Sequence, residues 1–176
     1  PLLDLKGLLP KEEIQSLIDR IVSRGGMVKN LHGQKNLYYQ VNATYYSALG
    51  ASDEKMLLAR AIQMFMPGKP QIWYLDLFAG KNDHEAVQRA GESGHKEINR
   101  TNLSTDQIAE GLKKDVVQKQ LALIRMRNTH KAFSEGAEVA ISGGEKSLEI
   151  RWEYNSAFVT LYVNFESGTY TIVESR

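Results

Sequence analysis

The chain has 176 residues, of which 42% are hydrophobic and 24% are charged, a composition typical of a folded protein and not of a disordered one. Its 22 basic residues nearly balance its 21 acidic residues, so no nucleic acid or membrane partner is predicted from charge. The absence of cysteine excludes disulfides and thiolate metal sites and favours a cytoplasmic location.

The chain begins with a predicted helix. Pro10 suits the first helical position, and apolar residues then recur at helical spacing until Gly25-Gly26, which predicts a helix over residues 10–24. The polar stretch Val28–Leu37 has no sustained period and predicts a loop. The β-prone residues 38–42 predict a short strand.

A second helix and a buried strand follow. Ser52 is a suitable N-cap for a helix that Pro67 closes. The body of this helix, residues 56–66, is apolar on nearly all sides and is therefore expected to be covered on more than one side. The apolar run Gln71–Phe78 predicts a strand buried on both faces in a parallel sheet, so this region is half of a β/α unit.

The segment Ala79–Asn102 is long, charged and rich in glycine, which is typical of a functional loop. After it, Ser104-Thr105-Asp106-Gln107 forms a capping box, and an apolar stripe predicts a helix over about residues 115–128. From Phe133 the hydrophobic period changes to that of strands. Four antiparallel strands are predicted, at Ala137–Ser142, Leu148–Trp152, Phe158–Asn164 and Thr169–Val173.

Two groups of residues have the chemistry to bind a ligand. Four tyrosines are able to stack on sugars, although aromatic residues beside a strand also pack cores: Tyr38, Tyr39, Tyr45 and Tyr46. Basic residues in the segment 81–100 are able to hold an anion such as phosphate, or belong to a solvated loop: Lys81, Arg89, His95, Lys96 and Arg100.

No metal site, cofactor or catalytic residue is predicted from local motifs. The four histidines lack the i, i+4 spacing of a helical zinc pair: His32, His84, His95 and His130. No nucleophile motif marks a serine, and with no cysteine a nucleophile would have to be serine, threonine or a carboxylate.

Several sequence blocks stand in the order and spacing of a known family and cover most of residues 5–130. They are Tyr39–Gly50, Ala59–Gln63, Pro67–Gln71, Ala79–Asp83 and Glu97–Arg100. Together they resemble the sucrose phosphorylase family of the alpha-amylase superfamily. The resemblance implies an α/β fold, the last part of a (β/α)8 barrel in residues 1–132, followed by a small C-terminal antiparallel β domain in residues 133–176. Gln71–Phe78 would be the eighth barrel strand, and the loop after it would lie where barrel active sites lie.

The resemblance also implies an activity. Members of the family are retaining glucoside phosphorylases, in which one carboxylate attacks the anomeric carbon, a second assists the leaving group and phosphate replaces water. The products are α-glucose 1-phosphate and the released acceptor. The catalytic carboxylates of the family belong before the segment at which Pro1 stands, so no catalytic residue is expected here and the chain alone is expected to be inactive. The expected partners are a small sugar substrate, inorganic phosphate and the missing N-terminal barrel portion.

Three substrate-binding residues follow from the resemblance. Tyr39 and Gln40 match the loop that faces the acceptor and phosphate. Lys96 matches a position where sucrose phosphorylases have an arginine that holds the glucosyl unit, and a lysine lacks the bidentate fork of that arginine. Arg60 and Arg100 also match, and structural roles are expected for both.

The substrate and the class of function stay open. Leu37 stands where members acting on sucrose have an acidic residue, which disfavours sucrose itself. The block Gly94–Arg100 resembles more closely the relatives that act on glucosylglycerate or similar small glucosides. The alternatives are a hydrolase or transglucosylase of the same superfamily and, from another class, a non-catalytic sugar-binding or interaction module. For the chain alone, six apolar residues are expected to face solvent and to invite self-association: Leu57, Leu58, Ile62, Phe65, Ile72 and Trp73.

Overall fold

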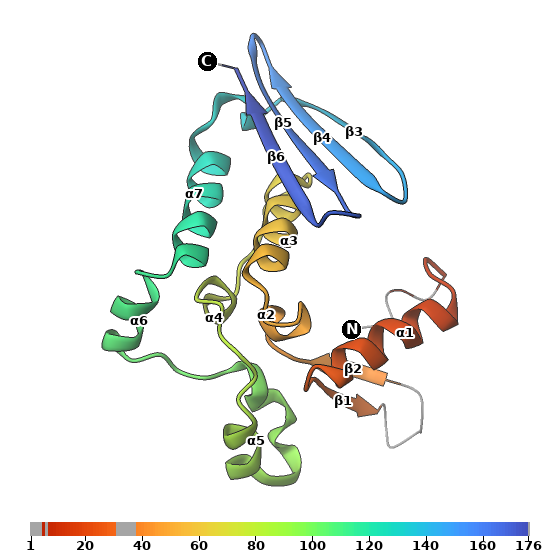
Figure 1. Cartoon of the computed structure of the whole chain (residues 1–176), viewed down its shortest axis with the longest axis vertical. Coiled ribbons are helices and arrows are strands. Elements are labelled where there is room, and N and C mark those ends of the chain that lie inside the picture. The colour runs from red at the N-terminus through yellow and green to blue at the C-terminus, as the bar shows by residue number, and fades with distance from the viewer. Residues whose placement is uncertain (1–4, 6, 31–37, 176) are drawn as a thin grey trace. The chain divides into compact units, whose positions relative to one another are not determined.

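The computed structural model describes residues 5, 7–30 and 38–175, whose elements Figure 1 shows in chain order. The chain forms two compact units. The first consists of Pro1–Ser52 and Trp73–Ala109, and the second of Asp53–Ile72 and Glu110–Arg176. The domain boundary expected near residue 132 differs from this division and stays a prediction. Within the described residues, no helix combines the length and the apolar character needed to cross a membrane.

The first unit begins with helix α1 (Lys11–Ser23), which follows Pro10 as predicted. Strand β1 (Met27–Asn30) then pairs antiparallel with β2 (Tyr38–Asn42). Strand β2 confirms the strand predicted at residues 38–42. The loop prediction for Val28–Leu37 is wrong at residues 28–30, because these residues pair with β2 and so form a strand although their sequence shows no clear period. Residues 31–37 of that prediction lie outside the described residues.

Short helices make up much of the rest of the first unit: α2 (Tyr45–Ala48), α4 (Tyr74–Leu77), α5 (His84–Ala90) and the 3-10 segment η3 (Gly91–Asn99). Two predictions are therefore wrong. The apolar run Gln71–Phe78 is not a strand, since its second half is α4 and neither sheet of the described chain includes it. The predicted loop Ala79–Asn102 contains α5 and η3. Periodicity alone does not separate a short buried strand from a short helix.

Side-chain caps fix where two helices begin. Thr44 precedes α2, and its Oγ1 accepts a hydrogen bond from the backbone N–H of Ser47 at 3.1 Å. Helix α6 (Thr105–Gly111) has the predicted capping box: Ser104 Oγ accepts from the N–H of Gln107 at 3.2 Å, and Gln107 Oε1 accepts from the N–H of Ser104 at 2.8 Å. This reciprocal pair confirms the sequence motif.

The second unit contains a four-stranded antiparallel sheet whose strands lie in chain order. The strands are β3 (Glu138–Gly143), β4 (Ser147–Tyr154), β5 (Ala157–Asn164) and β6 (Thr169–Glu174), which confirms the four predicted strands. Alternation along β4 and β5 places one apolar row on one face, where Ile150 pairs with Leu161 and Trp152 pairs with Val159. All four of these side chains are buried.

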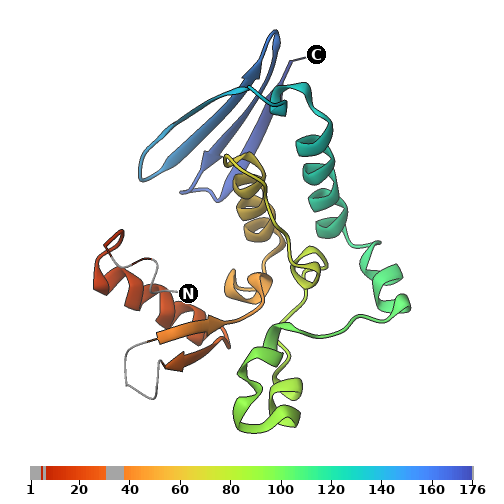
Figure 2. The same cartoon turned by 180° about the vertical axis from the view of Figure 1, so that it is seen from behind.

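Helices α3 (Asp53–Phe65) and α7 (Asp115–Thr129) pack against each other, and α3 also contacts the sheet, as both views in Figures 1 and 2 show. The indole N–H of Trp152 donates to the carbonyl of Phe65 at 2.7 Å. Helix α3 is thus covered on more than one side, as its apolar surface predicts. The 3-10 turn η4 (Lys131–Phe133) links α7 to the sheet, and Phe133 packs edge-on against both Phe65 and Trp152.

This packing corrects the prediction of an exposed apolar face. Phe65 is buried, at 1% exposure, because α7 and the sheet share one core with α3. Leu57 on α3 is also buried, at 9% exposure. Leu58, Ile62 and Ile72 are partly buried against the same core. Of the six apolar residues predicted to face solvent, Trp73 is half exposed, and it belongs to the first unit. Most of the face expected to mediate self-association is therefore covered within the unit.

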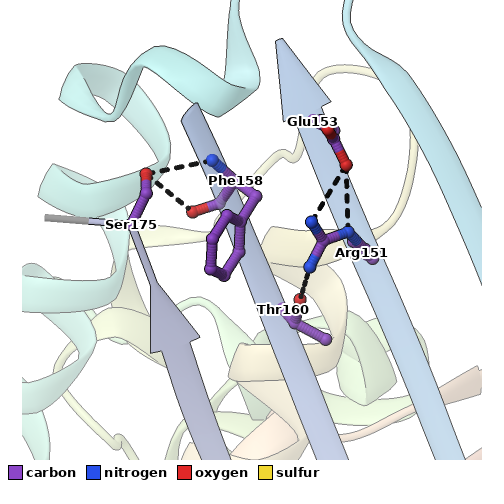
Figure 3. A network of polar contacts seen from close by, with 5 residues as sticks. All are labelled: Arg151, Glu153, Phe158, Thr160 and Ser175. Carbon is purple, nitrogen blue, oxygen red and sulfur yellow. Dashed lines mark hydrogen bonds and ion pairs between the residues drawn. The ribbon is translucent and has the colours of Figure 1, made fainter. Parts of the chain in front are cut away.

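The opposite face of the sheet carries polar contacts, shown in Figure 3. Arg151 donates from Nε and Nη2 to Glu153 Oε2 at 3.1 and 2.9 Å, and from Nη1 to Thr160 Oγ1 at 3.3 Å. Its guanidinium also lies 4.3 Å from the ring centroid of Phe158. Ser175 Oγ accepts from the N–H of Phe158 at 3.0 Å, which joins the end of the chain to β5. These contacts join β4 to β5 and β5 to the residue that follows β6.

Candidate functional site

A pocket of about 320 Å³ lies in the first unit. Three segments line it: the end of β2, the residues around the start of α4, and the end of η3. The lining residues are Gln40 and Asn42, then Trp73 and Asp76, then Lys96, Asn99 and Arg100. Its volume is at the lower end of the range for small-molecule sites.

Hydrogen bonds hold these three segments together. The indole Nε1 of Trp73 donates to the carbonyl of Asn99 at 3.0 Å. Asn99 Nδ2 in turn donates to the carbonyl of Ala43, just after β2, at 3.2 Å. Asp76 Oδ1 accepts from the N–H of Tyr45 at 2.8 Å. The walls of the pocket are therefore fixed to one another by the fold itself.

Two amide side chains in the pocket have polar atoms with no hydrogen-bond partner among the described residues. They are Gln40 Oε1 and Asn42 Nδ2, both shielded from solvent. Because side chains alternate along a strand, residues 40 and 42 lie on the same face of β2. A buried polar atom without a partner costs about 1–3 kcal/mol, so this face is suited to a polar ligand that supplies both a donor and an acceptor.

The charges in the pocket are mixed. Lys96 and Arg100 supply cations, and Arg100 Nη1 lies 3.6 Å from Glu97 Oε1 in an exposed ion pair. Asp76 supplies a carboxylate, which disfavours a site dedicated to anions alone. Amides, both signs of charge and the half-exposed ring of Trp73 suit a molecule with many hydroxyl groups, since each hydroxyl both donates and accepts.

His95 lies next to Lys96 on η3, and its Nε2 is shielded from solvent with no partner among the described residues. Burial lowers the pKa of His95 below its usual value, and the charges of Lys29 and Lys96 lower it further. The imidazole is therefore neutral at neutral pH.

The basic residues that the sequence groups together are dispersed in the structure. Lys96 and Arg100 line the pocket, whereas Lys81 is exposed and Arg89 pairs with Glu85 across 3.7 Å on α5. In the part of the chain that the structure describes, no group of three or more His, Cys, Asp or Glu side chains could hold a metal ion.

The structure brings Gln40 and Lys96 into one pocket, although they come from different segments. Tyr39 lies in β2, but its side chain is outside the described part of the structure. Sequence reasoning did not propose Asn42, Trp73, Asp76 or Asn99 as site residues. Asn42 was detectable, because it stands two positions after Gln40 in a predicted strand and so shares its face.

Comparisons with known proteins give the family. No family model matches the chain. A protein named sucrose 6(F)-phosphate phosphorylase from Ilumatobacter coccineus is 50% identical over 100% of the chain, and the chain covers 35% of that protein. A sucrose phosphorylase from Agrobacterium vitis is 39% identical over 96% of the chain, which again covers 35% of it.

A solved structure, sucrose 6F-phosphate phosphorylase from Thermoanaerobacter thermosaccharolyticum, matches with a TM-score of 0.90 at 36% identity. The match covers 98% of this chain and 36% of the other. It confirms the predicted fold class: α/β, the last part of a (β/α)8 barrel followed by a small C-terminal antiparallel β domain. The chain therefore belongs to the sucrose phosphorylase family of the alpha-amylase superfamily, and spans about 35% of the length of the relatives it matches.

Proposed function

We propose that this chain is the substrate-side part of a retaining α-glucoside phosphorylase, which transfers a glucosyl group to inorganic phosphate and forms α-glucose 1-phosphate. The observation that supports it best is the pocket in which Gln40 and Lys96 meet, together with membership of a family whose compared members are named phosphorylases. The proposal assigns the nucleophile and the acid/base to a part of the enzyme outside this chain. We propose a cytoplasmic location for the enzyme, because a chain without cysteine suits a reducing compartment.

In this proposal the pocket binds and orients the sugar. The Lys96 ammonium donates hydrogen bonds as a point charge, which holds a hydroxyl or a phosphate oxygen without the planar geometry of an arginine. Gln40 accepts from a hydroxyl, and the ring of Trp73 offers an apolar surface to a sugar face. Tyr39 is also proposed to bind substrate, because by resemblance it matches the loop of the family that faces the acceptor and phosphate.

The proposed substrate is a small α-glucoside whose acceptor carries a negative charge. The relative from Ilumatobacter coccineus is named for a phosphorylated sucrose, and the sequence also favours a glucosylglycerate-like substrate over sucrose. Both acceptors are anionic. Lys96 and Arg100 lie at the pocket, and Leu37 stands where an acidic residue would repel such a group.

The test uses the complete protein that contains this chain. It is incubated with inorganic phosphate and with sucrose, sucrose 6(F)-phosphate or glucosylglycerate, and α-glucose 1-phosphate and free glucose are measured separately. One molecule of α-glucose 1-phosphate per released acceptor is expected, with a preference for the anionic acceptors. Free glucose without α-glucose 1-phosphate would refute the phosphorylase and indicate a hydrolase or transglucosylase. Sugar binding without any turnover would indicate a non-catalytic module.

A matched pair of variants tests the pocket. Lys96→Met removes the cation that lines it, and is expected to lower kcat/KM about tenfold or more, because a charge-assisted hydrogen bond contributes about 1.5–3 kcal/mol. Lys81→Met removes an exposed lysine of the same region that does not line the pocket, and is expected to leave kcat/KM unchanged. Equal effects of the two variants would contradict the assignment of Lys96.

A further inference from the structure

We propose that Asn42 is an additional substrate-binding residue, whose Nδ2 donates a hydrogen bond to a hydroxyl of the glucosyl group. This inference rests on the proposed function. It adds a residue that neither the sequence motifs nor the resemblance assigns to the site.

Burial combined with the lack of a partner is the first argument. Asn42 is 9% exposed, yet it lines the pocket, and its Nδ2 has no hydrogen-bond partner among the described residues. The polar groups next to it in the chain are engaged: the carbonyl of Ala43 accepts from Asn99 at 3.2 Å, and the N–H of Thr44 donates to Asn82 Oδ1 at 2.7 Å. The fold thus satisfies its neighbours and leaves this amide for a molecule in the pocket.

The position of Asn42 on a strand is the second argument. Met27 pairs with Asn42 and Lys29 pairs with Gln40, so both amides are held by the β1–β2 register and share one face. Gln40 Oε1 and Asn42 Nδ2 are an acceptor and a donor side by side. A pyranose carries hydroxyls on neighbouring carbons, and these are able to give a proton to one amide and accept one from the other. Side chains fixed on a strand bind with less loss of conformational freedom than side chains on a loop.

The chemistry of the pocket favours a hydroxyl over a phosphate at this place. A phosphate oxygen would accept from Asn42 but would meet two other acceptors in the same pocket, Gln40 Oε1 and the Asp76 carboxylate. A hydroxyl accepts from Asn42 and donates to one of the two acceptors, and a neighbouring hydroxyl of the same sugar supplies a donor for the other. Asn42 is therefore assigned to the sugar and not to the phosphate.

The experiment measures synthesis from α-glucose 1-phosphate and acceptor by the complete protein. Asn42→Ala deletes the amide, and Asn42→Asp keeps its shape but removes the donor. Both are expected to lower kcat/KM for α-glucose 1-phosphate about tenfold, with melting temperatures near that of the unsubstituted protein. The control Asn102→Asp introduces the same charge at an exposed asparagine outside the pocket and is expected to leave kcat/KM unchanged.

A series of monodeoxy α-glucose 1-phosphates, each lacking one hydroxyl, separates binding from a merely structural role. For the donor that lacks the hydroxyl bound by Asn42, the substitution is expected to cause almost no further loss, whereas the tenfold loss persists with the others. The same loss with every donor would overturn the inference, as would full activity of both variants. Failure of the proposed function looks different, because the unsubstituted protein would then release no phosphate from α-glucose 1-phosphate.

Discussion

Replacing Gln120 with leucine tests whether Arg60 is a structural residue. Both side chains are buried, at 0% and 2% exposure, and Arg60 Nε donates to Gln120 Oε1 at 2.9 Å, joining α3 to α7. Arg60 Nη1 also donates to Gln63 on its own helix. A hydrogen bond to a charged group contributes about 1.5–3 kcal/mol, so Gln120→Leu is expected to lower the free energy of unfolding by about 2 kcal/mol. Urea denaturation of the full chain, followed by tryptophan fluorescence, measures it.

A double-mutant cycle separates the interaction energy between Arg60 and Gln120 from the effect of changing the size of either side chain. Arg60→Met alone leaves a buried amide oxygen without this donor and is expected to cost about 1–3 kcal/mol. The double variant R60M/Q120L removes both partners and is expected to be no less stable than either single variant, which gives a coupling energy of at least about 2 kcal/mol. Gln88→Leu, at an exposed glutamine of α5, is the control and should change stability by less than about 0.5 kcal/mol. If the two single effects simply add, the reasoning is wrong.

Two further predictions concern stability. Trp152→Phe removes the indole donor to the carbonyl of Phe65 and is expected to lower the free energy of unfolding by about 1–2 kcal/mol in urea; an unchanged midpoint would contradict the buried bond. The N–H of Ala86 and then the hydroxyl of Thr101, at 2.8 and 2.9 Å, lower the pKa of Asp83 below its usual 3.8. The contribution of Asp83 to the free energy of unfolding is therefore present above the unfolded pKa and lost as pH falls through the lower folded pKa. Asp83→Asn is expected to flatten the stability profile across that acidic range. Identical profiles of the two proteins would count against this.

Local signals predicted much of the secondary structure. Pro10 marks the start of α1, the capping box at Ser104 marks the start of α6, and alternation predicts the four strands of the sheet. Each of these signals depends on residues within one or two turns or on the pleat of one strand, so the sequence contains all that is needed. The failures are two short segments: Val28–Asn30 is a strand because it pairs with β2, and the second half of Gln71–Phe78 is helix α4.

The candidate site was predictable only in part. Gln40 and Lys96 were named from sequence blocks, and the structure brings them to one pocket. Trp73 was assigned to a buried strand, but its ring is half exposed and lines the pocket. No local pattern marks Asn99 either, because its role depends on a hydrogen bond to Ala43 in a distant segment.

Local patterns were enough to predict the helices and strands with strong signals, because caps and alternation are properties of neighbouring residues. The ordered sequence blocks were enough to indicate the family. Which apolar residues are buried, and which polar residues meet, depends on the packing of distant segments. Phe65 is buried because α7 and the sheet close over α3, and Asn42 joins Lys96 because hydrogen bonds between distant segments fix the pocket walls. Both outcomes depend on contacts between residues far apart in the chain, and no local pattern encodes these.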